Sequence, residues 1–277
     1  MRFGIKTAPQ DTTWADMLSV WRAADGIDVF ESAWNFDHFY PIFSDPTGPC
    51  LEAWTTLAAL AQATTRLRLG VMVTGNPYRH PAVLANMAAS ADIISGGRLE
   101  VGLGAGWNDD ECAAYGIDLP PLAERFDRFD EAVEVIVRLL SDEVTDFPGR
   151  HYILTNARCE PKPVQRPHPP IAIGGTGEKR TLRTAAKWAQ HWNCVGGPLE
   201  RFTRAADVLH ERCAEIGRDA TEITKSVQLR LGDDVGALAA EAAEFGEAGA
   251  DVVIVYLPPP HSPHVLEPLA KALEPLR

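Results

Sequence analysis

The chain has 277 residues, 45% of them hydrophobic, which is enough to bury a large core. No stretch approaches the roughly eighteen uninterrupted apolar residues of a membrane span, and the N-terminal sequence MRFGIKTAPQ has no apolar signal-peptide core. The formal net charge of −12 argues against nucleic acid or an anionic membrane as partner. Five scattered cysteines without a CxxC pair predict reduced thiols in a cytoplasmic protein.

Short β-rich runs alternate with longer helical patterns along the chain. The predicted strands are Phe3–Lys6, Val29–Trp34, Leu67–Val73, Leu99–Leu103, Ile171–Ile173, Trp192–Val195, Ser226–Leu231 and Val252–Leu257. The predicted helices are Trp14–Ala24, Leu51–Ala63, Ala82–Ile94, Ala123–Leu140, Lys179–Ala189, Leu199–Ile216, Val235–Ala248 and Val265–Leu276.

Eight strand–helix units predict an α/β fold, a (β/α)8 TIM barrel formed by a single domain over residues 1–277. The alternative is a doubly wound sheet, which usually opens with a GxGxxG turn after its first strand. Here the first strand is followed by Thr7-Ala8-Pro9-Gln10, without that turn. The Pro-rich residues 146–170 are too long for a simple connection, and we expect an insertion that contains a hairpin and covers the barrel mouth.

The second predicted strand ends in the sequence Trp34-Asn35-Phe36-Asp37-His38-Phe39, which places titratable groups among aromatic side chains. Functional residues of such barrels gather where strands end, at the C-terminal face. A histidine beside an aspartate can act there as a general acid or base. A histidine that only caps the strand end through a backbone hydrogen bond is the alternative.

The third and fourth predicted strands end in loops that could form pocket walls. Gly75 and two prolines make a rigid loop after the third strand, which suits a pocket wall or a plain turn. The fourth strand ends in Gly102-Leu103-Gly104-Ala105-Gly106-Trp107, and its glycines indicate that something flat or bulky lies against the backbone. The acidic residues 109–111 that follow are interpreted as favouring a helix N-terminus.

The fifth predicted strand ends in Gly174-Gly175-Thr176-Gly177, and a helical pattern with Lys179, Arg180 and Arg183 begins at once. Glycines allow close approach of a ligand, and a helix start offers unpaired N–H groups. This segment predicts a site for a phosphate or similar anion. An ordinary strand-to-helix turn remains the alternative. No metal site is predicted, because His261 and His264 have no further ligands spaced around them.

The ordered set of these segments resembles the luciferase-like monooxygenase superfamily, and most closely its actinobacterial branch that uses the deazaflavin coenzyme F420. The resemblance covers essentially the whole chain. The segments that carry it are WNFDHFYP (34–41), LGVMVTGNPYRHPAVLANMAASADIISGGRLEVGLGAGWNDDE (69–111), LAERFDRFDEAVEVI (122–136) and IGGTGEKRTLRTAAKWAQHWN (173–193).

The resemblance implies that a flavin-type ring lies at the barrel mouth, backed by a non-prolyl cis peptide between Met72 and Val73. It also implies that His38 is the catalytic acid or base. The predicted cofactor contacts are Asp37, His38, Met72, Val73, Gly104, Ala105, Gly106, Gly174, Gly175, Thr176, Gly177, Lys179 and Arg180. The residues predicted to shape the substrate side are Tyr40, Trp107 and Tyr256.

The chain also departs from the sugar-phosphate dehydrogenases of this group. They carry an acidic residue after the fourth-strand glycines, where this chain has Trp107, so the acid partner of His38 is left open. Their sugar-phosphate lysines have no match here, so glucose 6-phosphate is not the expected substrate.

The function predicted from the sequence is an F420-dependent oxidoreductase that transfers hydride to or from a small organic molecule. One alternative is a two-component monooxygenase that uses FMN. Another is a non-catalytic protein that carries or sequesters the cofactor. We further expect a homodimer, and a separate enzyme that supplies reduced F420 or flavin.

Overall fold

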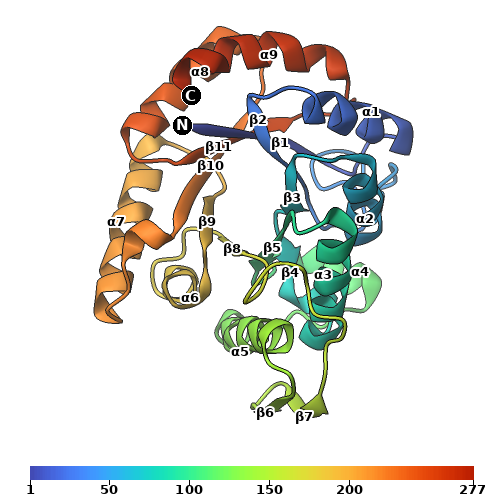
Figure 1. Cartoon of the computed structure of the whole chain (residues 1–277), viewed down its shortest axis with the longest axis vertical. Helices are drawn as coiled ribbons and strands as arrows, with labels where there is room; N and C mark the ends of the chain where they lie inside the picture. Colours follow the sequence, from blue (N-terminus) through green and yellow to red (C-terminus); the bar gives the residue numbers. More distant parts are fainter.

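Eight parallel strands form a closed barrel in the computed structural model, which describes all of residues 1–277 (Figure 1). The strand order is β3–β2–β1–β11–β10–β9–β8–β5, and β3 also pairs with β5, which closes the ring. These strands are β1 (Arg2–Thr7), β2 (Phe30–Asn35), β3 (Arg68–Val71), β5 (Leu99–Gly104), β8 (Ile171–Gly174), β9 (His191–Cys194), β10 (Thr224–Arg230) and β11 (Val252–Leu257). The predicted (β/α)8 barrel is confirmed.

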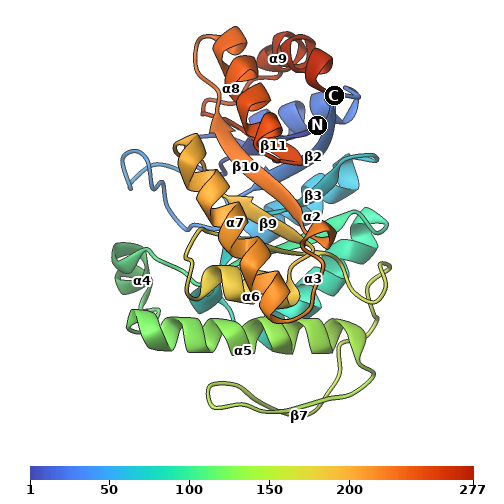
Figure 2. The same cartoon turned by 90° about the vertical axis from the view of Figure 1, so that its left-hand side faces the viewer.

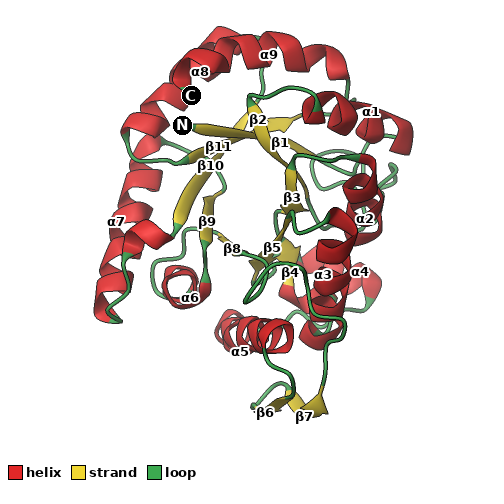
Figure 3. Ribbon diagram, in the orientation of Figure 1, coloured by secondary structure: helices red, strands yellow, loops and turns green.

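Helices surround the strands on the outside of the barrel (Figure 3). They are α1 (Trp14–Asp25), α2 (Ala53–Ala63), α3 (Pro81–Ser95), α4 (Asp109–Tyr115), α5 (Leu122–Ser141), α6 (Thr181–Trp188), α7 (Leu199–Glu215), α8 (Val235–Glu247) and α9 (Leu266–Leu273). Short 3-10 turns complete them: η1 (Asn76–Tyr78), η2 (Ala220–Glu222), η3 (Pro263–Val265) and η4 (Glu274–Leu276).

Local sequence signals explain where several helices begin and end. The Thr13 hydroxyl accepts a hydrogen bond from the Asp16 N–H at 3.2 Å and so caps α1. Pro81 is the first residue of α3, where its missing N–H is not needed. Gly96, with φ +67°, ends the same helix in the left-handed conformation that glycine tolerates best.

The third predicted strand differs from the expectation at its end. Residues 67–73 were expected to form one strand, but β3 ends at Val71 and a two-residue strand, β4 (Thr74–Gly75), resumes the pairing with β5. Between them lies the non-prolyl cis peptide Met72–Val73 that the family resemblance implies. The predicted helix at Lys179 also begins later, at Thr181, because the glycine loop extends to Arg180.

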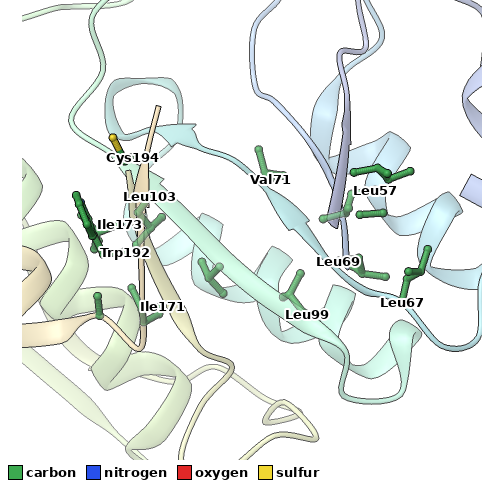
Figure 4. Close-up of a cluster of buried hydrophobic side chains, with 14 of the residues drawn as sticks. Leu57, Leu67, Leu69, Val71, Leu99, Leu103, Ile171, Ile173, Trp192 and Cys194 are labelled. Carbon is green, nitrogen blue, oxygen red and sulfur yellow. The ribbon is translucent and has the colours of Figure 1, made fainter. Parts of the chain in front are cut away.

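The main core fills the layer between strands and helices. Figure 4 shows part of it, with Leu69, Leu99 and Ile171 projecting from β3, β5 and β8. The barrel interior holds a much smaller apolar cluster of Trp34, Met72, Val252 and Ile254. Because outward positions are apolar and inward ones mixed, the polar side chains of these strands are directed toward the barrel axis and its mouth.

The insertion contains the expected hairpin, formed by β6 (Thr145–Pro148) and β7 (Ile153–Ala157). It does not cover the mouth: it lies beyond α5, outside the barrel, and no residue of 146–170 lines the mouth cavity (Figure 2). The Glu131 carboxylate on α5 accepts hydrogen bonds from three successive backbone N–H groups of the hairpin, at residues 150–152, at 2.8–3.1 Å. These bonds hold the turn of the hairpin against α5.

No helix is both long and apolar enough to cross a membrane. All five cysteines are free thiols.

Candidate active site

A cavity of about 670 Å³ opens at the carboxyl ends of the barrel strands. One wall comes from the segments that follow β3, β5 and β8. The opposite wall comes from β1, β10 and β11 and from the loop after β2. The lining residues of the first wall include Met72, Val73, Tyr78, Gly104, Ala105, Gly106, Trp107, Gly174, Gly175 and Thr181. Those of the second include Lys6, Phe36, Ile42, Phe43, Gln228, Arg230 and Tyr256.

Met72 and Val73, between β3 and β4, form a bulge in the barrel wall. This bulge explains the glycines of the neighbouring strands. A Cβ atom at Gly104 would lie 2.7 Å from a Val73 methyl group, and one at Gly174 would lie 2.9 Å from the other. A Cβ at Gly102 would lie 1.9 Å from the Val71 carbonyl oxygen. The bulky group expected against this backbone is therefore the protein's own bulge, which the glycines allow to project into the mouth.

His38 contacts an acidic partner inside the cavity wall. Its Nδ1 atom lies 2.7 Å from Oε2 of Glu111, which is fully buried. The other carboxylate oxygen accepts a hydrogen bond from the Phe39 N–H at 2.6 Å, and the Tyr78 hydroxyl donates to Oε2. The imidazole also lies edge-on to Trp107, with ring centroids 5.8 Å apart.

These contacts determine the protonation of the pair. Burial works to raise the pKa of Glu111, but hydrogen bonds from His38, Tyr78 and the Phe39 N–H outweigh it, so the pKa lies below its ordinary value. Burial, and then the hydrogen bond to Glu111, raise the pKa of Tyr78, which remains a neutral donor. An ionised carboxylate can only accept, so Nδ1 of His38 carries a proton. Nε2 makes no hydrogen bond within the protein and is free for a ligand.

The sequence indicated a different role for Glu111. The Asn108 side chain caps α4 by accepting from the Glu111 N–H at 3.2 Å, so Asn108 and Glu111 have the spacing of a capping box. The carboxylate does not reach back to the cap; it reaches across to His38. Only the fold brings these residues together, because 73 positions separate them.

Asp37 lines the cavity beside His38 and is paired within the protein. Its carboxylate forms an ion pair with Arg79, whose other side contacts Glu52 at the N-terminus of α2. Asp37 is nearly inaccessible to solvent. Burial raises the pKa of the Asp37 carboxyl group, although the Arg79 ion pair acts to lower it. The ion pair holds the carboxyl group in a fixed position at the cavity wall.

The glycine loop after β8 has the features of an anion site. Gly175 has φ +120°, which side chains rarely adopt, and its carbonyl accepts a hydrogen bond from the Trp192 indole at 2.8 Å. The Arg201 guanidinium donates to the Thr176 hydroxyl at 3.0 and 3.2 Å and lines the cavity. The N-terminus of α6 begins directly behind this loop, at Thr181.

The basic residues predicted for this site lie elsewhere. Arg180 donates to Asp127 and Asp130 of α5 at 2.7 and 2.8 Å, and Lys179 is exposed; neither lines the cavity. Sequence reasoning missed Arg201. A signal was present, since Gly196-Gly197-Pro198 before α7 continues the pattern of strand, glycines and helix one unit further along the chain.

Of the three residues predicted to shape the substrate side, two line the cavity and one does not. Trp107 and Tyr256 line the cavity, whereas Tyr40 lies outside the lining, near Tyr115. Lys6 lines the cavity from β1 and was not predicted, because it reads as the last residue of an ordinary strand. No group of three or more His, Cys, Asp or Glu side chains is arranged to hold a metal ion.

Comparison with known proteins agrees with this architecture. The family model described as luciferase-like monooxygenase matches residues 1–272, so the chain belongs to the luciferase-like monooxygenase family. An uncharacterised protein of Mycobacterium tuberculosis is 29% identical over 208 residues, which cover 75% of this chain and 70% of the relative. An F420-dependent glucose-6-phosphate dehydrogenase of Amycolatopsis mediterranei is 26% identical over 238 residues, which cover 84% of this chain and 70% of the relative.

Solved structures share the fold. An F420-dependent secondary alcohol dehydrogenase, in complex with an F420–acetone adduct, superimposes with a TM-score of 0.89 at 20% identity and covers 100% of this chain and 99% of that one. A monooxygenase from Streptomyces bottropensis superimposes with a TM-score of 0.80 at 23% identity. The match covers 100% of this chain and 99% of the monooxygenase chain.

Proposed function

We propose that this protein is an F420-dependent oxidoreductase that exchanges hydride with a small organic substrate. The observation that carries the proposal is the coupling of His38 to a buried carboxylate at the wall of a cavity that contains a peptide bulge and an anion loop. A relative and a solved structure named for F420 dependence support the choice of cofactor.

The residues of the cavity fit such a cofactor. A volume of about 670 Å³ lies within the usual range for sites that hold organic ligands. The Val73 bulge would back the ring, and the Gly174–Gly177 loop with Arg201 would hold the phosphate. Asp37 would contact the ring end. When bound, F420 supplies a ring carbon that carries hydride.

The protein's own contribution to the chemistry is proton transfer and positioning. His38 Nε2 faces the cavity and would hold or accept the proton that accompanies hydride transfer at a carbon–oxygen bond. The Glu111 carboxylate would orient the ring by accepting a hydrogen bond from Nδ1. Trp107 beside His38 and Tyr256 on the opposite wall would exclude water and orient the substrate. A homodimer and a separate enzyme that reduces the cofactor remain expectations.

Hydride transfer is tested by loading the protein with reduced F420 that carries deuterium at the hydride-bearing carbon. The loaded protein is screened against small carbonyl compounds, and products are analysed by mass spectrometry. We expect a product that contains deuterium and depends on His38. Incorporation of labelled oxygen with reduced FMN, without deuterium transfer from F420, would instead support the monooxygenase alternative.

A further inference from the structure

The wall opposite the Val73 bulge carries two basic side chains beside a tyrosine. Lys6 of β1 pairs in register with Tyr256 of β11, and Tyr256 pairs with Arg230 of β10. Partners in a parallel sheet lie about 4.8 Å apart and project to the same face. All three side chains line the mouth cavity. They therefore form one continuous surface, which we call the basic wall.

Neither basic side chain of the basic wall forms an ion pair with an acidic side chain of the protein. The Lys6 ammonium donates a hydrogen bond to the amide oxygen of Gln228 at 2.7 Å and lies 5.6 Å from the centroid of the Phe36 ring. The Arg230 guanidinium lies over the Tyr256 ring, 5.2 Å from the ring centroid. The one carboxylate that lines the cavity, Asp37, is already paired with Arg79. The Arg230 guanidinium is thus a positive charge at this wall that no carboxylate of the cavity pairs with.

The lysine is held by a chain of buried hydrogen bonds. The Gln228 amide nitrogen donates to the Asn193 side-chain oxygen, and the Asn193 nitrogen donates to the Ser226 hydroxyl at 2.8 Å. This chain directs the Gln228 oxygen at Lys6. Asn193 and Ser226 are fully buried, and Lys6 is only 8% exposed. A basic group fixed in this way is pre-organised for a ligand, since little side-chain entropy remains to be lost.

An apolar surface adjoins the basic wall. Phe36, Ile42 and Phe43 line the cavity next to Tyr256. Phe36 packs with Tyr256 and Ile42 in one cluster, and the Phe43 ring lies 6.3 Å from the Tyr256 ring. Phe43 is 65% exposed, so this surface would lose contact with water when a ligand binds.

We propose that the basic wall binds a carboxylate of the substrate, and that the substrate is a ring-bearing carboxylic acid whose apolar part lies on Phe36, Phe43 and Tyr256. The inference rests on the proposed function, because the cofactor must occupy the Val73 side of the same cavity. Burial lowers the pKa of Lys6 to about 7. A bound carboxylate favours its charged form.

The test uses F420-loaded protein and two probes of nearly equal shape, 3-phenylpropanoate and its neutral amide, 3-phenylpropanamide. Calorimetry measures the affinity of each. We expect the carboxylate to bind at least about tenfold more tightly than the amide, as charge-assisted hydrogen bonds do. Lys6→Met and Arg230→Met should each reduce this preference without changing F420 affinity. Lys225→Met is the matched control. Lys225 lies on β10, as Arg230 does, but its ammonium pairs with Asp251.

Three results would overturn the inference: equal affinity of the two probes, no binding of the carboxylate at millimolar concentration, or a preference that survives both Lys6→Met and Arg230→Met. If these variants weaken F420 binding instead, the basic wall serves the cofactor and the inference is wrong. If wild-type protein does not bind F420 at all, the proposed function fails. The probe titration is then run on the cofactor-free protein and decides the carboxylate site separately.

Discussion

The Nδ1 atom of His38 lies 2.7 Å from Oε2 of Glu111, a carboxylate that is fully buried and accepts two further hydrogen bonds. This contact fixes the orientation of the imidazole and leaves Nε2 toward the cavity. Glu111 is thus the acidic partner of His38, which could not be assigned from the sequence because Trp107 stands where related dehydrogenases have an acidic residue. The two residues come from the loop after β2 and the helix after β5, so the barrel itself assembles the pair.

The first prediction concerns this pair. His38→Ala should lower turnover of the substrate identified by the deuterium screen by about a hundredfold to ten-thousandfold, the usual contribution of a general acid or base. F420 affinity should change little. Steady-state kinetics and a cofactor titration on the same preparation check both. Turnover that stays intact in His38→Ala would remove His38 from the mechanism.

Glu111 should act through His38 as a positioning residue. Glu111→Gln is expected to lower kcat with little effect on KM, because a neutral amide holds the Nδ1–H group of His38 less firmly than a carboxylate does. The downfield proton resonance of the His38–Glu111 hydrogen bond should disappear from the NMR spectrum. A purely structural role predicts a lower melting temperature but an unchanged kcat in the folded fraction.

The second prediction separates two arginines near the glycine loop. Arg201→Gln should weaken F420 binding by about tenfold or more, because Arg201 lines the cavity and contacts Thr176. Arg180→Gln should leave the affinity nearly unchanged, because Arg180 pairs with Asp127 and Asp130 outside the cavity. Fluorescence titration checks both. The reverse ranking would return the phosphate contact to Arg180, as the sequence predicted.

The third prediction tests the contact between the bulge and the glycines. Gly104→Ala should lower the free energy of unfolding by about 1–3 kcal/mol, because the added Cβ would lie 2.7 Å from Val73. The same change should cost less in a Val73→Ala background, where that methyl group is gone. Gly232→Ala is the control, since nothing lies within 4 Å of its Cβ position. Chemical denaturation measures the free energy of unfolding of Gly104→Ala, Val73→Ala, the double variant and Gly232→Ala. An equal cost in both backgrounds would show that Val73 is not the obstacle.

The fourth prediction follows from the burial of Lys6. Burial lowers its pKa from 10.5 to about 7, so at pH values below about 7 the folded protein carries the full cost of a charged, desolvated lysine. Between pH 7 and 10.5 the folded state has released this proton and the unfolded state still holds it. The free energy of unfolding of the wild type therefore rises with pH relative to that of a variant without the lysine.

Lys6→Met should accordingly be more stable than wild type near neutral pH, with an advantage that shrinks by roughly 3 kcal/mol toward pH ~9.5. The groups that face Lys6 are Gln228 and Phe36, with Arg230, Tyr256, His38 and the Arg79-paired Asp37 around the same cavity. Urea denaturation at several pH values measures how the stability difference between Lys6→Met and wild type changes with pH. A stability advantage of Lys6→Met that grows with pH would contradict the lowered pKa of Lys6.

Much of the barrel could be predicted from the sequence, because its signals are local. Apolar periodicity predicted all eight barrel strands, and Thr13 and Pro81 stand at the starts of α1 and α3, where these residue types are common. The end of the third strand could not be predicted from periodicity, since the chain remains apolar through Val73 while the backbone leaves the sheet. Only the family resemblance indicated the bulge.

Long-range partners account for most of what was missed at the site. Glu111 fits a capping pattern, so its sequence context gave no reason to pair it with His38. The basic run at residues 179–183 was assigned to the anion site because it is close in sequence, but in the fold Arg180 turns to α5 while Arg201 reaches the loop from α7. The hairpin was expected over the mouth, but Glu131 holds it against α5.

Equilibrium titration of the purified protein with F420 and, separately, with FMN tests the central claim most directly. Cofactor fluorescence reports binding, and Arg201→Gln serves as the site-specific control. We predict saturable F420 binding that is tighter than FMN binding and is weakened by the Arg201 substitution. Tight FMN binding without any response to F420 would contradict the proposed function.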